Sequence, residues 1–207
     1  MTPTPYSPSA DRNKQPILDV LQTQLPDRGL ALEIASGTGQ HAAWFMAAMP
    51  QWNWQTSDFD ANALPGIALR MVQSNCDRAP PPVRLDVCDL QWPSQGAEFV
   101  RRFDLVYCAN MLHIAPWACC AALMQGCARY LSAHGLLVLY GPYLEAEVPT
   151  APGNVAFDQD LRVRNPSWGL RTRDDVQAQA ARVGLALRAR HTMPANNLLL
   201  VFERQAD

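Results

Sequence analysis

The stretch Leu30-Ala31-Leu32-Glu33-Ile34-Ala35-Ser36-Gly37-Thr38-Gly39 decides the fold class of this chain. Its first six residues form a short, mainly apolar run, which is typical of a buried parallel strand. The two glycines that follow allow the backbone to turn sharply and to approach a ligand with no side chain in the way. Residues from about Gln40 to Met49 then predict a helix, which Pro50 ends. The segment therefore predicts a strand, a ligand-binding loop and a helix.

The same alternation of strand and helix continues along the chain. Strands are predicted over residues 53–57, 83–87, 103–108, 136–140, 186–191 and 198–203, and helices over about 16–25, 63–74, 116–131 and 173–183. This alternation indicates a parallel sheet with helices on both faces. The last two strands are joined by a connection too short for a crossover, so they must pair antiparallel. The pattern predicts an α/β, Rossmann-like fold with a mostly parallel seven-stranded sheet.

Composition and charge narrow the possible partners. The chain has 207 residues, 48% of them hydrophobic, which fits one domain with an ample core. A formal net charge of -2 provides no basic excess that would steer the protein to nucleic acid or to an anionic membrane. The first eight residues have neither the basic start nor the apolar run of a secretory signal. We therefore expect a cytoplasmic protein with no nucleic-acid or membrane partner.

The six cysteines form no Cys-x-x-Cys pair. Cys88 and Cys108 fall inside apolar, strand-like runs, and Cys119 and Cys120 are adjacent on a predicted helix. This arrangement favours buried, reduced thiols over a disulfide framework or a metal site.

Polar residues follow the ends of successive predicted strands, where an open parallel sheet binds its ligands. Glu33 ends the first strand, and its carboxylate can hold a cationic amino group. Asp58 ends the second strand, where an acid can accept hydrogen bonds from both hydroxyls of a ribose. Asp89 ends the third strand, where it can accept from an adenine amino group. Asn110 and His113 follow the fourth strand.

Other roles remain open for some of these residues. Asp60 is an alternative to Asp58, and Asp89 could instead cap a helix. His113 could pack beneath the ligand and bond a backbone carbonyl rather than take part in chemistry.

Several stretches resemble known families. Glu33-Ile34-Ala35-Ser36-Gly37-Thr38-Gly39 resembles motif I of class I S-adenosylmethionine-dependent methyltransferases, although many of these have cysteine or glycine at position 36. Phe103-Asp104-Leu105-Val106 with Asn110-Met111-Leu112-His113-Ile114 resembles their fourth-strand motif. The stretches at residues 7–14, 54–58 and 157–171 resemble the methyltransferase-like 26 (DUF938) family, the last of them most specifically. The resemblance implies the class I methyltransferase fold and S-adenosylmethionine as cofactor, and it implies no substrate.

Together these signals predict a cofactor site and an acceptor site. Cofactor contacts are expected from Arg12, Asn13, Glu33, Ala35, Ser36, Gly37, Gly39, Asp58, Phe59, Asp89, Leu90 and Asn110. Catalytic candidates are His113 and Tyr143, although a base is needed only if the acceptor atom arrives protonated. Substrate candidates are Tyr143, Asp158, Arg164, Asn165, Trp168 and Arg171. The two arginines could instead pair with Asp158 and Asp160 and hold their segment together.

The expected function is methyl transfer from S-adenosylmethionine to a small-molecule acceptor by a single domain spanning residues 1–207. Residues 1–15 are expected to form an arm or lid, and residues 141–171 an insertion that lines the acceptor site. One alternative is a non-catalytic domain that binds S-adenosylmethionine and mediates interactions. A further alternative is an NAD(P)-dependent reductase, because residues 37–42 fit a loose dinucleotide fingerprint. Glu33 and the antiparallel ending of the sheet count against this second alternative.

Overall fold

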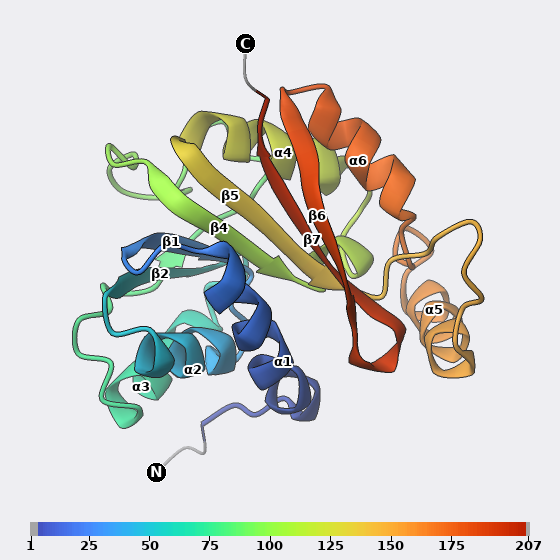
Figure 1. Cartoon of the computed structure of the whole chain (residues 1–207). Coiled ribbons are helices and arrows are strands. Elements are labelled where there is room, and N and C mark those ends of the chain that lie inside the picture. Colours follow the sequence, from blue (N-terminus) through green and yellow to red (C-terminus); the bar gives the residue numbers. More distant parts are fainter. Residues whose placement is uncertain (1–3, 206–207) are drawn as a thin grey trace.

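The computed structural model describes residues 4–205 and shows a central sheet covered by helices on both faces (Figure 1). The helices are α1 (Pro8–Gln24), α2 (Gln40–Ala48), α3 (Leu64–Gln73), α4 (Ala118–Tyr130), α5 (Pro152–Arg164) and α6 (Arg173–Ala181). The strands are β1 (Gly29–Ile34), β2 (Trp52–Asp58), β3 (Val83–Arg84), β4 (Phe103–Ala109), β5 (Leu131–Gly141), β6 (Leu185–Met193) and β7 (Asn197–Arg204).

The seven strands lie in the order β3-β2-β1-β4-β5-β7-β6. Strands β3, β2, β1, β4 and β5 pair in parallel, and β7 is antiparallel to both of its neighbours. This arrangement confirms the predicted Rossmann-like sheet with its antiparallel ending. The direction of strand order reverses between β1 and β4, which is where such sheets bind ligands.

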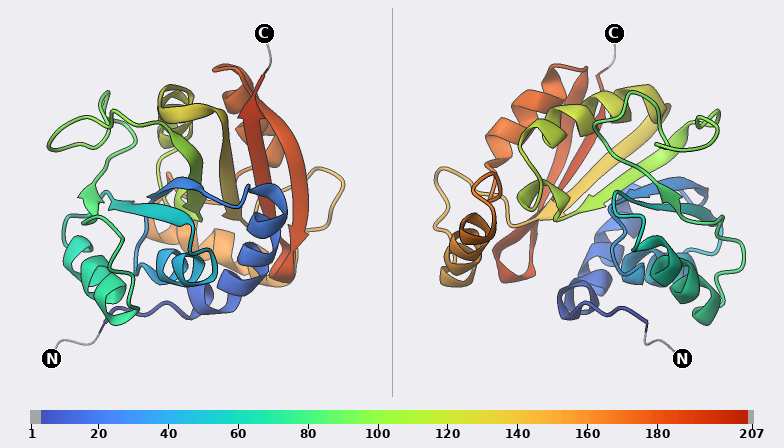
Figure 2. Two further views of the ribbon diagram at one scale, coloured as in Figure 1. Left: turned by 60° about the vertical axis from the view of Figure 1, so that its left-hand side comes forward. Right: turned by 180° about the vertical axis from the view of Figure 1, so that it is seen from behind.

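Strand β4 illustrates how the sheet forms a core on each face. Leu105 and Tyr107 pack into one cluster with residues of α1, α2 and α3, whereas Val106 and Cys108 pack into a second cluster with residues of α4 and α6. Seen from behind, α4 and α6 lie in front of the central strands (Figure 2). Because successive side chains of a strand point to opposite faces, a strand covered on both sides must be apolar at nearly every position.

The first helix begins earlier than the sequence predicts. It starts at Pro8, with the hydroxyl of Ser7 accepting a hydrogen bond from the backbone N–H of Ala10, and Pro16 lies inside it rather than at its start. Proline is well tolerated in a first turn, and burial of Ile17 offsets the hydrogen bond lost at Pro16. The expected arm is therefore largely the first two turns of α1, while residues 1–3 lie outside the described part.

The third strand is shorter than predicted, ending at Arg84 instead of residue 87. The backbone N–H of Asp86 donates to the hydroxyl of Ser94 at 2.7 Å rather than to a neighbouring strand. The chain therefore leaves the sheet before Asp86. The expected insertion after β5 is not a plain loop: it contains the helix α5.

The insertion lies beyond the carboxyl ends of the central strands, beside the tip of the β6–β7 hairpin (Figure 1). Asn154 of α5 donates a hydrogen bond to the carbonyl of Asn196 in this tip, and Asn196 in turn accepts from the N–H of Ala151. Between residues 4 and 205, no helix is long and apolar enough to span a membrane.

Candidate functional site

The backbone is strained where β1 and β4 end. Ala35 and Asn110 adopt positive φ angles of 55° and 61°, although they are not glycines. Gly37 and Gly39, with φ angles of 57° and 70°, continue this loop. A left-handed conformation of a non-glycine residue costs free energy of about 1 kcal/mol or more, and such residues cluster at binding sites. Strain therefore marks the point in the sheet where the strand order reverses.

A cavity of about 480 Å³ opens at this edge of the sheet. Its wall consists of residues at or after the ends of β1, β2, β3 and β4, one residue of α4 and one residue of the insertion: Ile34, Ala35, Asp58, Phe59, Leu85, Asp86, Val87, Cys88, Met111, Ile114, Ala115, Pro116, Cys119 and Trp168. The volume lies within the range of small-molecule and cofactor sites, roughly 300–1,000 Å³.

Glu33 is a buried carboxylate next to the cavity: its neighbours Ile34 and Ala35 line the cavity, whereas Glu33 is not among the lining residues of the described chain. Its side chain is 2% exposed, and its Oε2 atom has no hydrogen-bond partner among residues 4–205. Burial raises the pKa of Glu33 to about 8. His41 lies 4.0 Å away, but burial lowers its pKa to about 4, so its ring is neutral near pH 7. Glu33 thus offers an unsatisfied acceptor to a ligand ammonium group, which would restore its charged form.

Asp58 holds the glycine loop. Its Oδ2 atom accepts from the N–H of Gly37 at 2.8 Å, and its Oδ1 atom accepts from the N–H of Asp60 at 3.0 Å. Each carboxylate oxygen retains acceptor capacity for a further donor, such as a ribose hydroxyl. Asp60 instead accepts hydrogen bonds from the side chain and the backbone N–H of Asn62. Within residues 4–205, Asp60 is not one of the residues that line the cavity. Asp58 is therefore the better candidate of the two.

The acid that follows β3 in the cavity is Asp86, not Asp89. Asp86 lines the cavity. Asp89 and Leu90 are exposed, and within residues 4–205 they are not among the lining residues. The predicted strand end was wrong, because β3 ends three residues earlier than its apolar pattern suggests. The cofactor contacts expected from Asp89 and Leu90 stay a prediction. Cys88 is likewise exposed rather than buried in a strand.

The first helix reaches the site through Asn13. Its Oδ1 atom lies 2.7 Å from Nε2 of His41, and Nδ1 of the same ring lies 3.4 Å from the hydroxyl of Tyr107. If Nε2 carries the proton, it donates to Asn13 and leaves Nδ1 as an acceptor. This contact fixes α1 against the helix that follows the glycine loop. Arg12 is exposed and donates to Ser9 of its own helix.

The two catalytic candidates, His113 and Tyr143, pack on each other with ring centroids 4.7 Å apart. His113 is fully buried, and burial lowers the pKa of its ring to about 3. A Cβ atom at Gly141 would lie 2.4 Å from its Nε2 atom, so glycine is required there. In the part of the chain that the structure describes, neither residue is among those that line the cavity. This geometry favours packing for His113, although neither of its ring nitrogens has a hydrogen-bond partner among residues 4–205. The catalytic roles of His113 and Tyr143 stay predictions.

Most substrate candidates in the insertion bond to the insertion itself. Asp158 accepts from Arg162 and from the N–H of Leu170, and Arg164 pairs with the exposed Asp160 at 3.6 Å. The side chain of Asn165 accepts from both the N–H and the hydroxyl of Ser167. These contacts stabilise the segment rather than present groups to a ligand.

Trp168 is the residue of the insertion that lines the cavity. It is held in place by its neighbours, because Gly169 donates its N–H to the carbonyl of His113 at 2.9 Å. The guanidinium of Arg171 donates to the carbonyls of Leu112, Ala115 and Ser167. The segment thus ties Trp168 to the turn that follows β4.

Replacement of Arg171 by lysine is expected to destabilise the protein by about 1–3 kcal/mol, because one ammonium group cannot reproduce the planar arrangement that reaches three carbonyls. Thermal unfolding measures the effect. Arg164→Lys is the matched control, since Arg164 is exposed, and it should unfold like the wild type. Equal stability of Arg171→Lys and the wild type would contradict the assigned role.

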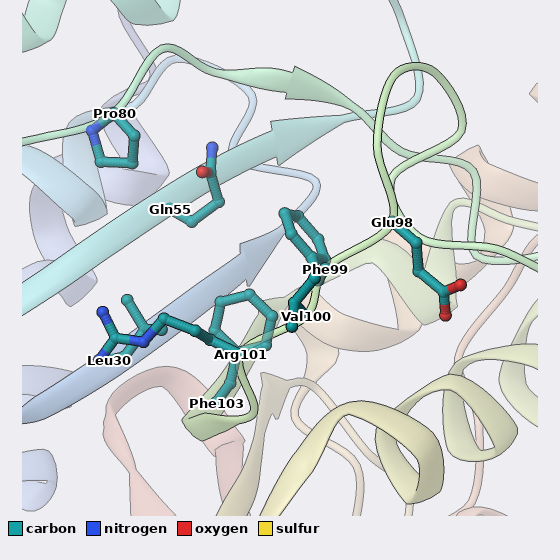
Figure 3. Close-up of a pocket in the computed structure, with 8 residues that line it drawn as sticks. All are labelled: Leu30, Gln55, Pro80, Glu98, Phe99, Val100, Arg101 and Phe103. Carbon is teal, nitrogen blue, oxygen red and sulfur yellow. The ribbon is translucent and has the colours of Figure 1, made fainter.

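A second hollow, of about 300 Å³, lies away from this edge, near the starts of β1 and β4 (Figure 3). It is lined by Leu30, Gln55, Pro80, Glu98, Phe99, Val100, Arg101 and Phe103. Glu98 accepts a hydrogen bond from the hydroxyl of Tyr130 at 2.7 Å. The hollow lies apart from the strained loops and from Glu33, so the strand-end cavity is the candidate site.

Comparison with solved structures identifies the fold. An O-methyltransferase family protein from Burkholderia thailandensis aligns with a TM-score of 0.78 at 17% identity over 96% of this chain and 58% of its own. CalO1, a methyltransferase in calicheamicin biosynthesis with S-adenosylhomocysteine bound, gives 0.74 at 16% identity over 95% and 55%. An O-methyltransferase family 2 protein from Planctomyces limnophilus, in complex with apigenin, gives 0.76 at 17% identity over 95% and 60%.

The chain therefore spans somewhat more than half the length of these proteins and shares the methyltransferase fold with them. A family described as "Protein of unknown function (DUF938)" matches residues 4–204, almost the whole chain. This match confirms the family expected from the sequence: the chain belongs to the DUF938 family.

Proposed function

We propose that this chain binds S-adenosylmethionine in the strand-end cavity and transfers its methyl group to a small-molecule acceptor. The observation that carries the proposal is the buried carboxylate of Glu33, whose Oε2 atom has no hydrogen-bond partner among residues 4–205, beside a strained glycine loop. An unpaired buried polar group is costly, and a ligand, an ion or a water that pairs with it removes this cost. The cationic amino group of a methionine moiety has the charge that Glu33 requires.

Three acids would hold the hydrogen-bond donors of the cofactor. Glu33 would bind the ammonium group, Asp58 the ribose hydroxyls and Asp86 the adenine amino group. Apolar side chains in the wall, among them Met111 and Trp168, would cover the adenine ring. The same three carboxylates would repel the negatively charged pyrophosphate of NAD(P). This arrangement therefore favours S-adenosylmethionine over NAD(P).

When bound, the cofactor supplies a methyl group on a good leaving group, so the protein mainly aligns the acceptor and excludes water. In the described part of the chain, the cavity wall has no histidine, lysine or tyrosine that could act as a base. The named O-methyltransferases of similar fold support a small-molecule acceptor, to which this site would contribute positioning rather than proton transfer.

Turnover tests the catalytic half of the proposal. Purified full-length chain is incubated with S-adenosylmethionine and a panel of small phenols, carboxylic acids, amines and thiols, and the S-adenosylhomocysteine formed is measured. We expect acceptor-dependent product, with activity lost in Asp58→Ala. Saturable cofactor binding without product for any acceptor, including a metabolite extract, would contradict catalysis and favour a non-catalytic binding domain.

Binding of the cofactor should depend on pH through Glu33. The pKa of Glu33 is raised by burial to about 8, so near pH 7 the free protein carries a proton that must leave before the carboxylate can pair with an ammonium group. Affinity for S-adenosylhomocysteine should therefore rise from pH 6 to pH 8, by roughly tenfold per pH unit, with release of roughly one proton per ligand. Titration calorimetry in buffers of different ionisation enthalpy measures this release. Proton-neutral binding at pH 7 would contradict the role of Glu33.

A further inference from the structure

Two cysteine sulfurs meet at the rim of the cavity. The Sγ atoms of Cys88 and Cys119 lie 3.6 Å apart, although the residues are 31 positions apart in the chain. Cys88 lies in the loop that follows β3, and Cys119 lies in the first turn of α4. The remaining four cysteines are all buried, whereas Cys88 is exposed and Cys119 is half-buried. This pair is therefore the one that a soluble oxidant can reach.

Both cysteines line the cavity, and each belongs to a different segment of its wall. One segment carries Asp86 and Val87 after β3, and the other carries Ala115 and Pro116 before α4. The sulfur pair is a contact between these two segments. A bond between the sulfurs would tie the segments together.

We propose that Cys88 and Cys119 form a reversible disulfide that closes the cofactor cavity when the protein is oxidised. A disulfide requires a sulfur–sulfur distance of about 2.05 Å, so the two sulfurs must come about 1.5 Å closer. This movement draws the loop after β3 towards α4 and narrows the space between them. The effect on ligand binding rests on the proposed function, but formation of the bond does not.

The reaction balances with a peroxide as the oxidant. A thiolate of the pair attacks one oxygen of hydrogen peroxide, which gives a sulfenic acid and hydroxide. The second thiol then displaces the sulfenic oxygen as water and forms the sulfur–sulfur bond. In total, two thiols and one peroxide yield one disulfide and two waters. Both electrons leave the cysteines and reduce the peroxide.

Burial, together with the neighbouring thiol, raises the pKa of Cys88 to about 12. Cys88 therefore stays protonated near neutral pH, where a thiol is a poor nucleophile. The bond should form slowly at pH 7 and faster at pH 9. Such a pair responds to sustained oxidation and not to a brief exposure.

The experiment uses the full-length chain, treated with hydrogen peroxide and then digested without reduction. Peptide mass spectrometry identifies the crosslink, and calorimetry measures binding of S-adenosylhomocysteine before oxidation, after oxidation and after dithiothreitol. Cys88→Ser and Cys119→Ser are treated in parallel, each compared with its own reduced form. We expect a Cys88–Cys119 crosslink, a decrease in wild-type affinity of about tenfold or more that dithiothreitol reverses, and no such oxidative decrease in either variant.

Each other outcome is decisive. Crosslinks among different cysteines, or oxidation of single cysteines without a bond, would overturn the proposal. A Cys88–Cys119 crosslink that leaves affinity unchanged would overturn the closure of the cavity. If the reduced wild type itself fails to bind S-adenosylhomocysteine, the proposed function fails, while the crosslink is still decided by the peptide map.

Discussion

Glu33→Gln is expected to weaken binding of S-adenosylhomocysteine at pH 8 by at least about a hundredfold. Removal of one partner of a buried ion pair costs about 3–5 kcal/mol, and each 1.4 kcal/mol is a factor of about ten in affinity. Glutamine keeps the shape of the side chain and one acceptor oxygen, and it removes the negative charge. Calorimetric titration of the two proteins measures the difference.

The same variant should be more stable than the wild type in the absence of ligand. The pKa of Glu33 is raised by burial from an ordinary value of 4.5 to about 8, so between these pH values the folded protein binds a proton that the unfolded chain does not. The stability of the ligand-free wild type therefore falls as pH rises from about 5 to 8, and glutamine removes this loss. A higher melting temperature of Glu33→Gln at pH 8 is the expected result.

Glu98→Gln is the matched control, because Glu98 is an exposed carboxylate in the second hollow (Figure 3). It should leave the affinity for S-adenosylhomocysteine unchanged. Wild-type affinity in Glu33→Gln, or a melting temperature at pH 8 below that of the wild type, would contradict the role assigned to this carboxylate.

Gly126→Ala is expected to destabilise the protein by about 3 kcal/mol or more. Gly126 lies in α4, where a Cβ atom would come within 2.0 Å of the indole of Trp92. Trp92 is fully buried and stacks on Tyr130 with ring centroids 5.3 Å apart, so it has no free space into which to move. The steric clash should far exceed the roughly 1 kcal/mol by which alanine favours a helix.

Gly153→Ala provides the control for this change. Gly153 lies in α5, and a Cβ atom there would meet nothing within 4 Å. Alanine at this position should leave the midpoint of urea unfolding equal to, or above, that of the wild type. A midpoint for Gly126→Ala that matches the one for Gly153→Ala would contradict the close packing of α4 on Trp92.

The sheet could be predicted from the sequence because local patterns determine it. Strands such as β4 are apolar on both faces, and their periodicity and length distinguish them from helices. The glycine loop after β1 and the acid at the end of β2 follow from the same pattern, since both directly follow an apolar run. Thr172 caps α6, the helix expected over residues 173–183, with its hydroxyl accepting from the N–H of Asp175.

Contacts between separate segments account for the features that the sequence did not predict. The strand β3 ends early because Ser94 bonds the N–H of Asp86, so the acid in the cavity differs from the one expected. Whether His113 is exposed depends on Gly141 and on the insertion that covers it. No apolar periodicity in the chain signals these contacts, because they join residues of separate segments.

The most direct test of the central claim is calorimetric titration of the purified wild-type chain at pH 8 with S-adenosylmethionine, S-adenosylhomocysteine and NADH. We predict saturable binding of the two sulfur compounds at one site per chain and no binding of NADH. Binding of NADH, with no response to either sulfur compound, would contradict the claim that this cavity is an S-adenosylmethionine site.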